Sequence, residues 1–551
     1  MLDALRSGTR DHPFDVLVIG GGITGVGVAL DAAARGFRTA LVERDDFASG
    51  TSSKSSKMVH GGLRYLQNGD VRLVYEALRE RRRLMRNAPH LVEILPFMIP
   101  IMSKDGVVSK KVAKALGSAM WMYDLTGGWR IGRLHRRVSA TRAARHFPTA
   151  HLDRLSAGYI YFDAAADDAR LTLTVARTAA RHGAVVANRC AVTDIAHDDA
   201  GRAVGVTVDA GGDTFDVAAR CIVNAAGVWA DEVRSLDEPD HLDSIRPAKG
   251  VHISLPWEKI RVDIAVIIPV RRDRRSLFLV PWGPRADGTF DHVYVGTTDT
   301  DDDGPLDDPQ CTGDDIDYIL TALNDALTET ITRDDITGVW AGLRPLVKAS
   351  DDGGDSARTA DLSRQHQVAV SRAGVVRVNG GKLTTYRQMA EDTVDLVAAR
   401  LDAPRRSRRS GTRRLELLGA CRPDASPGTP DHHLAHRYGA LADEIRALIA
   451  FRPDLDAPLV PGQPYLRAEA VYAVRHEMAT TLDDVLTRRT RAHLFDRGAS
   501  LAAAPAVAEL IGAELGWSSD ERARQLDAYR RRCEHEENAG AEHANVTNAA
   551  D

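Results

Sequence analysis

The segment from Asp15 to Glu43, DVLVIGGGITGVGVALDAAARGFRTALVE, restricts the fold of this chain more than any other feature. Its β-branched apolar run Val16–Ile19 predicts a strand that is buried on both faces. A GxGxxG pattern follows, which permits a tight turn, close approach of a pyrophosphate and close helix packing, at Gly20, Gly22 and Gly25. Helical composition continues to Gly36, and a second apolar run ends at Glu43, whose carboxylate can accept hydrogen bonds from a ribose 2′-hydroxyl. The segment therefore predicts a dinucleotide-binding βαβ unit.

The identity of the dinucleotide follows from Glu43 and from two later segments. A carboxylate at this position repels a 2′-phosphate, which favours an NAD-like or FAD-like adenosine half. The run CIVNAAGVWAD brings the small residues Ala226 and Gly227 to the end of a strand. The run VVRVNGGKLTTYRQMAEDTV places Gly381 in a turn and starts a helix near Leu383, where a helix N-terminus stabilises negative charge on a ligand. Either run alone could be an ordinary turn, but the three segments together favour FAD, whose length requires contacts from distant parts of the chain.

Composition excludes several classes of protein. The 72 basic and 77 acidic residues nearly balance, which indicates no nucleic-acid partner. The five cysteines are scattered without a CxxC pair, which argues against a disulfide framework and a zinc site and favours a reducing cytosol. We expect no metal site, because the cluster His432, His433 and His436 has no cysteine partners. No apolar run of about 18 residues and no N-terminal apolar segment is present, so we expect neither a membrane-spanning helix nor secretion.

The chain of 551 residues divides into four predicted regions. Residues 1–401 alternate strand-like and helical runs and form the dinucleotide domain with an interleaved second domain. Residues 402–431 begin with the basic, turn-rich run DAPRRSRRSGTRR, which predicts an exposed linker. Residues 432–534 have helical spacing and predict an all-helical C-terminal domain. The polar residues 535–551 predict a disordered tail.

Longer motifs carry a family resemblance. The run ASGTSSKSSKMVHGGLRYLQNGDVRLVYEALRERR, together with RPAKGVHISLP, VGTTD, AGLRPL, NGGKLTTYR and the C-terminal VRHEMATTLDDVLTRRTRA, strongly resembles the FAD-dependent glycerol-3-phosphate dehydrogenases of the aerobic type. The resemblance extends from about residue 14 to residue 534. It implies a Rossmann-like, glutathione-reductase-like α/β FAD domain interleaved with an antiparallel-sheet substrate domain, followed by a helical domain. It also implies oxidation of sn-glycerol-3-phosphate to dihydroxyacetone phosphate, with the electrons passing through FAD to a membrane quinone.

The resemblance assigns roles to further residues. The loop after the dinucleotide unit contributes to the FAD site through Ser52, Ser53, Ser56, Gly61 and Gly62, although a polar flexible loop explains the same composition. Arginine suits a phosphate dianion because it donates two parallel hydrogen bonds, and the candidates are Arg64, Arg344 and Arg364, with Arg358 as an alternative to Arg364.

The proton and hydride chemistry points to a second group of residues. His252 has an intrinsic pKa suited to removing the proton of the C2 hydroxyl, although it could equally be a buried, hydrogen-bonded histidine. Lys382 can stabilise developing negative charge. Tyr65 and Thr298 are candidate hydrogen-bond donors to the substrate. We expect His252, Arg344 and Lys382 to be catalytic.

Two charged segments allow further predictions. Residues 107–122, VVSKKVAKALGSAMWM, can place Lys110, Lys111 and Lys114 on one helical side and apolar residues on another, as in an interfacial helix, with core packing as the alternative. We therefore expect a cytoplasmic enzyme attached peripherally to the inner face of the membrane, and a homodimer remains open. The arginines of residues 79–86 predict a solvated helix face, and those of residues 271–275 a hairpin tip.

Three rival functions remain open. Glycerol-3-phosphate oxidase would use the same substrate pocket but pass electrons to oxygen and make hydrogen peroxide. An amine or amino-acid oxidase would share the fold. A non-enzymatic flavin-binding redox sensor would leave the predicted anion-binding residues without a role.

Overall fold

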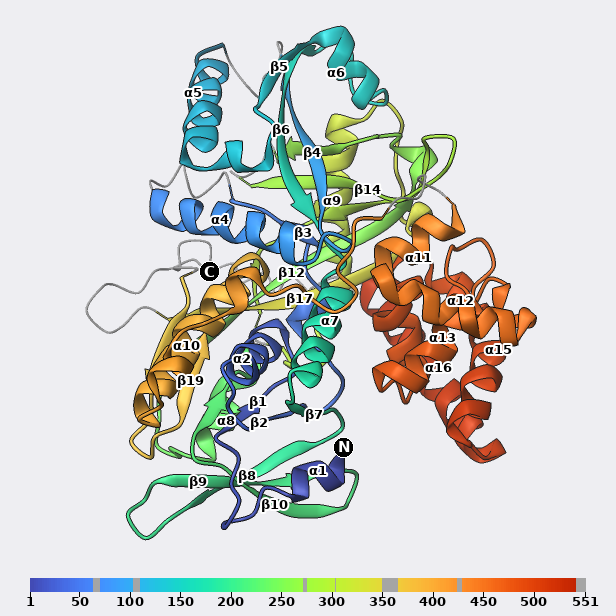
Figure 1. Ribbon diagram of the computed structural model, residues 1–551. Coiled ribbons are helices and arrows are strands. Elements are labelled where there is room, and N and C mark those ends of the chain that lie inside the picture. The colour runs from blue at the N-terminus through green and yellow to red at the C-terminus, as the bar shows by residue number, and fades with distance from the viewer. Residues whose placement is uncertain are drawn as a thin grey trace, which may run out of the picture.

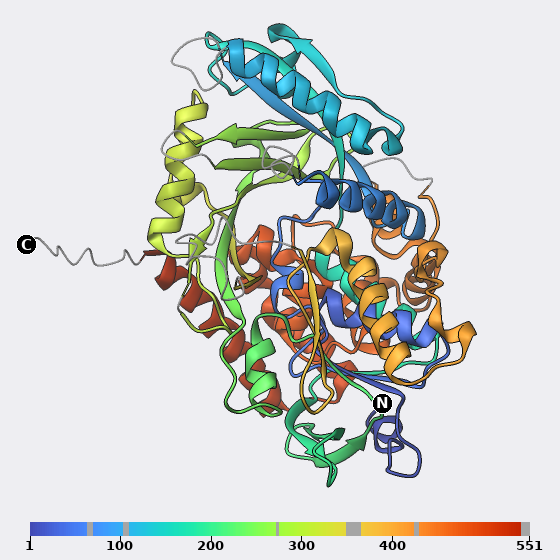
Figure 2. The same cartoon turned by 90° about the vertical axis from the view of Figure 1, so that its left-hand side faces the viewer.

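The computed structural model has three sheets and a helical C-terminal domain (Figure 1). It describes residues 1–62, 70–102, 110–270, 275–302, 304–348, 365–423 and 429–541, and the side chains of residues 110–116 lie outside this description. In both views the large mixed sheet lies above the parallel sheet, and the N-terminus lies below the parallel sheet (Figures 1 and 2).

The first sheet is the predicted dinucleotide unit extended by later strands. Its order is β18-β19-β11-β1-β2-β7, parallel except for β18, with β1 Val16–Ile19, β2 Thr39–Val42, β7 Val185–Ala187, β11 Ile222–Asn224, β18 Gln367–Val370 and β19 Val376–Asn379. Three helices share an apolar core with one face: α2 Ile23–Ala34, α7 Asp168–Arg181 and α10 Tyr386–Arg400. A three-stranded sheet shares a second core with α1 Leu2–Arg6 and the other face, and contains β8 Ala191–His197, β9 Ala203–Asp209 and β10 Thr214–Ala218. The parallel strands read as continuous apolar runs because both of their faces are covered.

The second large sheet is mixed and interleaved with the first along the chain. Its strands are β3 Met58–Val59, β4 Glu93–Met102, β5 Arg136–Ser139, β6 Leu155–Ala165, β12 Ile245–Pro256, β13 Ala265–Pro269, β14 Ser276–Pro284, β15 Phe290–Gly296, β16 Thr300–Asp301 and β17 Gly338–Val347. The helices of this part are α4 Val71–Asn87, α5 Lys110–Thr126, α6 Ala140–His146 and α9 Gly313–Ala326, whereas α8 Ala230–Ser235 follows β11 and lies beside the first sheet. The long antiparallel pair β12–β17 places His252 opposite Trp340. The predicted fold class is therefore confirmed.

The C-terminal domain is helical and packs around its own apolar core (Figure 1). Its α-helices are α11 Pro430–Tyr438, α12 Ala442–Phe451, α13 Arg467–Glu477, α14 Ala492–Phe495, α15 Arg497–Leu515 and α16 Ser519–Ala541, and a π-helix spans Asp484–Thr490. Among the described helices, α15 is long and apolar enough to cross a membrane, but Val507 and Ile511 are buried in this core. Helix α16 continues seven residues into the predicted disordered tail, where Glu536 pairs with His493, so that prediction is wrong for residues 535–541.

The predicted exposed linker is partly packed. The Thr412 hydroxyl donates to Asp31 of α2 at 3.1 Å and accepts from Arg387 of α10 at 3.3 Å, and its carbonyl accepts from Asn87 of α4 at 3.0 Å. Leu417 is also buried. The prediction of an exposed linker fails here because buried polar groups on three helices find their partners in this segment.

One arginine of α4 is not solvated. Arg81 is 1% exposed, forms an ion pair with Asp163, and donates to the carbonyls of Phe162 and Gly128. Tyr123 donates to the same Asp163 carboxylate at 2.7 Å. The predicted solvated face is therefore wrong for Arg81, because the helix turns this side toward the carboxylate on β6.

Candidate active site

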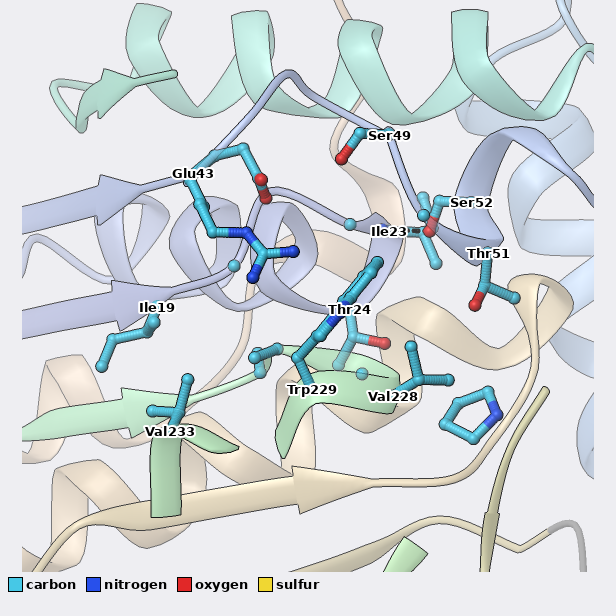
Figure 3. Close-up of a pocket in the computed structure, with 18 of the residues that line it drawn as sticks. Ile19, Ile23, Thr24, Glu43, Ser49, Thr51, Ser52, Val228, Trp229 and Val233 are labelled. Atoms are coloured by element: carbon cyan, nitrogen blue, oxygen red, sulfur yellow. Dashed lines mark hydrogen bonds between the residues drawn. The ribbon is translucent and has the colours of Figure 1, made fainter. Parts of the chain in front are cut away.

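A cavity of about 490 Å³ opens where the glycine-rich loop meets the start of α2, beyond the ends of β1, β2 and β11. Figure 3 shows Glu43 and Ser52 on one side of it and Trp229 opposite. Ligands of doubly wound sheets bind in this crevice. Of the predicted residues, the cavity is lined by Gly20, Gly22, Glu43, Ser52, Ala226, Gly227, Arg344, Gly381, Lys382 and Leu383.

The three glycines of the loop serve different steric needs. Gly20 has φ +112°, and a Cβ there would lie 2.7 Å from the carbonyl oxygen of Ala225. A Cβ on Gly25 would lie 2.0 Å from the carbonyl oxygen of Gly20, so this glycine permits the helix to pack on the strand end. A Cβ on Gly22 would meet only the Ser52 hydroxyl, at 3.2 Å. A side chain at Gly22 would therefore obstruct a ligand in the cavity more than it would disturb the packing of the protein.

The start of α2 is capped from another part of the chain. Gly22 is the N-cap residue and has no side chain, and the Ser52 hydroxyl accepts from the backbone N–H of Ile23 at 2.9 Å (Figure 3). The helix N-terminus faces the cavity and offers a site for an anionic group.

Glu43 directly follows β2 and lines the cavity. Its carboxylate accepts from the backbone N–H groups of Gly21 at 2.6 Å and Asp45 at 2.8 Å. Burial raises the pKa of Glu43 to about 7, against the opposing effect of these two hydrogen bonds, and the charges of Asp45 and Asp46 raise it further. The carboxylate thus gains from any additional hydrogen-bond donor that reaches it from the cavity.

The return contact after β19 has the predicted turn. Gly380 and Gly381 both have positive φ, +74° and +79°, which side chains rarely adopt. Lys382 follows, and the helix begins as a single 3₁₀ turn, Leu383–Thr385, before α10. This turn places the Lys382 side chain and the N-terminus of the helix at the same cavity.

His252 lies behind the wall of the cavity. It is 3% exposed on β12, its Nε2 lies 2.8 Å from the Ser56 hydroxyl, and its ring stacks on Trp340 at 4.9 Å and 10°. Burial and the nearby cations of Lys57 and Arg344 hold the pKa of His252 well below its ordinary value. The imidazole is therefore neutral near pH 7.

Arg344 reaches the cavity from β17, with its guanidinium held by the neighbouring loop. It donates to Asp299 at 3.0 Å, to the carbonyl of Lys249 at 3.2 Å, and to the Thr297 hydroxyl and the Thr298 carbonyl. Thr298 is 1% exposed, and its hydroxyl accepts from a backbone N–H of β12. Thr298 thus lies behind Arg344 and supports the arginine, and its contact with the substrate stays a prediction.

The other loop residues have different surroundings. Ser53 is buried, with its carbonyl bonded by Arg491, and Ser56 faces His252. Gly61 donates to Tyr123 at 3.1 Å beside α4, and Gly62 adjoins it with φ +74°. The predicted substrate residues Arg64, Tyr65 and Arg364, and the alternative Arg358, lie outside the described residues.

Comparisons with known proteins cover nearly the whole chain. A family model described as FAD dependent oxidoreductase matches residues 15–403, and one described as the C-terminal domain of alpha-glycerophosphate oxidase matches residues 410–522. Glycerol-3-phosphate dehydrogenase of Mycobacterium leprae is 41% identical over 96% of this chain and 89% of its own length. The chain belongs to the FAD-dependent glycerol-3-phosphate dehydrogenase family. The human mitochondrial glycerol-3-phosphate dehydrogenase is 36% identical over 94% of this chain and 73% of its own.

The solved structure of a relative has the same fold as this chain. The glycerol-3-phosphate dehydrogenase of Bacillus halodurans, complexed with FAD, has a TM-score of 0.75 at 29% identity and covers 98% of this chain and 97% of its own. The cavity fits the cofactor that the family requires. The helix start at Ile23 suits a pyrophosphate, Glu43 suits a ribose, and the turn at Gly381 can meet the far end of an extended molecule.

Three residues around the FAD cavity escaped prediction from the sequence. Trp229 donates to Asp307 at 2.9 Å, and Arg44 pairs with the same carboxylate while its guanidinium lies 5.1 Å from the indole. Trp229 lies in the run CIVNAAGVWAD, two residues after Gly227. An aromatic residue so close to a turn of small residues could have indicated a contact with the cofactor. Asp307 comes from a loop about 260 residues after Arg44 and could not be paired with it from spacing.

The C-terminal arginines also reach the FAD domain. Arg488 and Arg489 both bind the buried carboxylate of Asp46, three residues after Glu43. Arg491 binds Asp168 at 2.8 Å and the Ser53 carbonyl. The family motif of the helical domain therefore supports the loops that line the cofactor cavity.

Proposed function

We propose that this protein oxidises sn-glycerol-3-phosphate to dihydroxyacetone phosphate and passes the electrons to a membrane quinone. The observation that carries the proposal is about 40% identity to glycerol-3-phosphate dehydrogenases over nearly the full chain. It is supported by a cofactor cavity whose lining includes the cations Arg344 and Lys382, with a neutral histidine behind its wall. FAD, when bound, supplies the acceptor for the hydride of C2.

The neutral and the charged residues of the site have different roles in the proposed reaction. Neutral His252 accepts the proton of the C2 hydroxyl, and Ser56 holds its Nε2. Lys382 and Arg344 are cations at the cavity and stabilise the substrate oxygens. Arg64, Tyr65 and Arg364 remain predicted phosphate contacts.

The direct test is anaerobic addition of sn-glycerol-3-phosphate to the purified yellow protein while flavin absorbance is followed. We expect bleaching, with glycerol and sn-glycerol-1-phosphate as controls that bleach much more slowly. Arg64→Ala should chiefly raise KM, whereas His252→Ala and Lys382→Ala should chiefly lower kcat. An unbleached flavin, or parental turnover in both the His252 and Lys382 variants, would contradict the proposal.

Oxygen is the rival electron acceptor, because the C-terminal family model carries the name of alpha-glycerophosphate oxidase. Turnover with a short-chain ubiquinone or menaquinone analogue is compared with turnover in oxygen, with peroxide measured in parallel. We expect the quinone to be reduced faster. Stoichiometric peroxide at the same rate would assign the oxidase reaction instead.

Attachment to the inner face of the cell membrane would bring the enzyme to the quinone. Large apolar side chains are exposed on α5 and the short helix after it: Trp121 at 56%, Leu125 at 76% and Trp129 at 52%. In Figure 1, α4 and α5 lie on the side away from the helical domain. Such exposed apolar side chains beside predicted basic residues suit an anionic lipid surface.

Vesicle binding tests this attachment. Trp121→Glu with Leu125→Glu, and separately Lys110, Lys111 and Lys114 changed to Glu, should release the protein from anionic vesicles while reduction of a soluble dye continues. Phe451→Glu is the matched control, because Phe451 is 84% exposed on the helical domain. Unchanged binding in the α5 variants would move the contact elsewhere, to the basic residues 404–414 first.

A further inference from the structure

Lys57 is a buried cation that the reaction described above does not use. It is 0% exposed, and it follows Ser56, which holds His252. Its backbone has φ +54°, which is unusual for a residue with a side chain, and its N–H donates to the Ser55 hydroxyl at 3.0 Å. Such a costly backbone and a buried charge are kept only where the surrounding structure determines them.

The Lys57 ammonium is placed between an anion and an aromatic ring. It lies 3.5 Å from the Asp168 carboxylate and 4.4 Å from the ring centre of Trp340. The Trp340 indole also donates to the Ser55 carbonyl at 3.3 Å and stacks on His252. The cation therefore contacts the same ring that orients the imidazole.

We propose that Lys57 is a positioning residue for the redox reaction, which holds Trp340 and the Ser55–Ser56 turn so that His252 stays correctly oriented. This proposal rests on the proposed role of His252 as proton acceptor. Lys57 adds a cation–π contact and fixes both sides of the imidazole, its stacked face through Trp340 and its Nε2 through Ser56.

Lys57 also acts on His252 through its charge. Among the described residues, the charged groups that act on His252 are Lys57 and Arg344, and the Tyr294 ring lies 6.2 Å away. Both cations disfavour a second positive charge on the imidazole, so they lower the pKa of His252 together with burial. Removing the Lys57 charge should raise this pKa toward its ordinary value.

Lys57→Met tests the proposal with little loss of packing, because Met is also long and unbranched. Asp168 keeps its contact with Arg491 at 2.8 Å, so the variant leaves no unpaired carboxylate. We expect kcat for flavin reduction to fall by on the order of tenfold while KM and FAD content stay within about twofold, since Lys57 lies outside the cavity wall. Lys259→Met is the matched control, because the Lys259 side chain is 42% exposed and pairs with Asp335 at 2.7 Å. Trp340→Phe and Lys57→Gln serve if Lys57→Met does not fold.

A double-mutant cycle separates action through His252 from a general structural role. In a His252→Gln background, Lys57→Met should cause no further loss of kcat. The same loss in both backgrounds, or a change in KM instead of kcat, would overturn the proposal. Parental turnover in His252→Gln would refute the role of His252 and the proposal with it, whereas a parent that the substrate does not reduce would refute the proposed function itself.

The apoprotein gives a readout that is independent of turnover. A protonated histidine stacked on tryptophan quenches its fluorescence, so the difference in emission between the parent and Trp340→Phe follows the charge of His252 as pH falls. We expect the quenching to begin at higher pH in Lys57→Met than in the protein with Lys57. Identical titrations would refute the electrostatic part of the proposal.

Discussion

The affinity of the apoprotein for FAD should fall as the pH drops below neutrality. Glu43 must be ionised to accept ribose hydroxyls with full strength, and burial raises its pKa to about 7 before a ligand adds donors. Two ribose hydroxyls in the cavity would lower this pKa again, which couples cofactor binding to loss of a proton. The binding free energy therefore depends on pH.

The magnitude follows from the fraction of ionised Glu43. With a pKa of about 7, roughly one carboxylate in eleven is ionised at pH 6, so affinity should be about tenfold lower than at pH 8, or about 1.4 kcal/mol. The Kd for FAD is measured by fluorescence quenching at pH 6, 7 and 8. Glu43→Gln should bind about 1–3 kcal/mol more weakly at pH 8 and lose the pH dependence.

Asp45→Asn provides the matched control. The charge of Asp45 raises the pKa of Glu43 while its backbone N–H bonds the carboxylate. Asp45→Asn removes this charge but keeps the backbone N–H and Glu43, so the midpoint of the pH dependence should move to lower pH. A Kd that is constant from pH 6 to 8 in the parent, or an equal slope in Glu43→Gln, would refute this reasoning.

Three further predictions follow from the contacts described. Gly22→Val should fold but purify without flavin, whereas Gly25→Ala should fail to fold stably, because its Cβ would lie 2.0 Å from a backbone carbonyl; absorbance and thermal melting distinguish the two. Asp46→Asn should cost about 3–5 kcal/mol, because buried Arg489 loses the carboxylate it pairs with and Arg488 keeps only Asp483 and Asp484 among its described partners, whereas Asp431→Asn, in an exposed ion pair, should cost at most about 1 kcal/mol; denaturant melts measure both. Arg344→Lys should raise KM and lower kcat, each by roughly tenfold, because lysine lacks the planar fork; equal kinetics in the two proteins would remove Arg344 from the site.

The local features of the dinucleotide unit were predictable because adjacent residues determine them. Strand β1, helix α2 and strand β2 fall within the segment Asp15–Glu43, and each glycine has the steric surroundings that the motif requires. The turn at Gly380 and Gly381 was visible for the same reason. These elements depend on φ, burial and spacing over fewer than about 30 residues.

The misjudged features depend on partners far along the chain. Arg81 resembles its solvated neighbours on α4, and only the position of Asp163 on β6 explains its burial. Thr412 lies in a basic, turn-rich run, yet its partners are polar groups of three helices. The proposed role of Lys57 could not be predicted from the sequence either, since it requires Trp340, which lies 283 residues later. Sequence patterns report the face of a helix or strand but not which distant charge meets it.

The serines at positions 52, 53 and 56 look alike in sequence and should respond differently to loss of the hydroxyl. Ser52→Ala removes the cap of α2 at the cavity and should weaken FAD binding by about 1 kcal/mol. Ser56→Ala removes the partner of His252 and should lower kcat with unchanged FAD affinity. Ser53→Ala is the internal control, because among the described residues its hydroxyl makes only a 3.4 Å contact, to the Gly50 carbonyl. FAD titration and stopped-flow flavin reduction on the three variants measure both quantities. If Ser52→Ala changed only kcat, or Ser56→Ala only FAD affinity, this loop would not divide its contacts between the cofactor helix and the catalytic histidine.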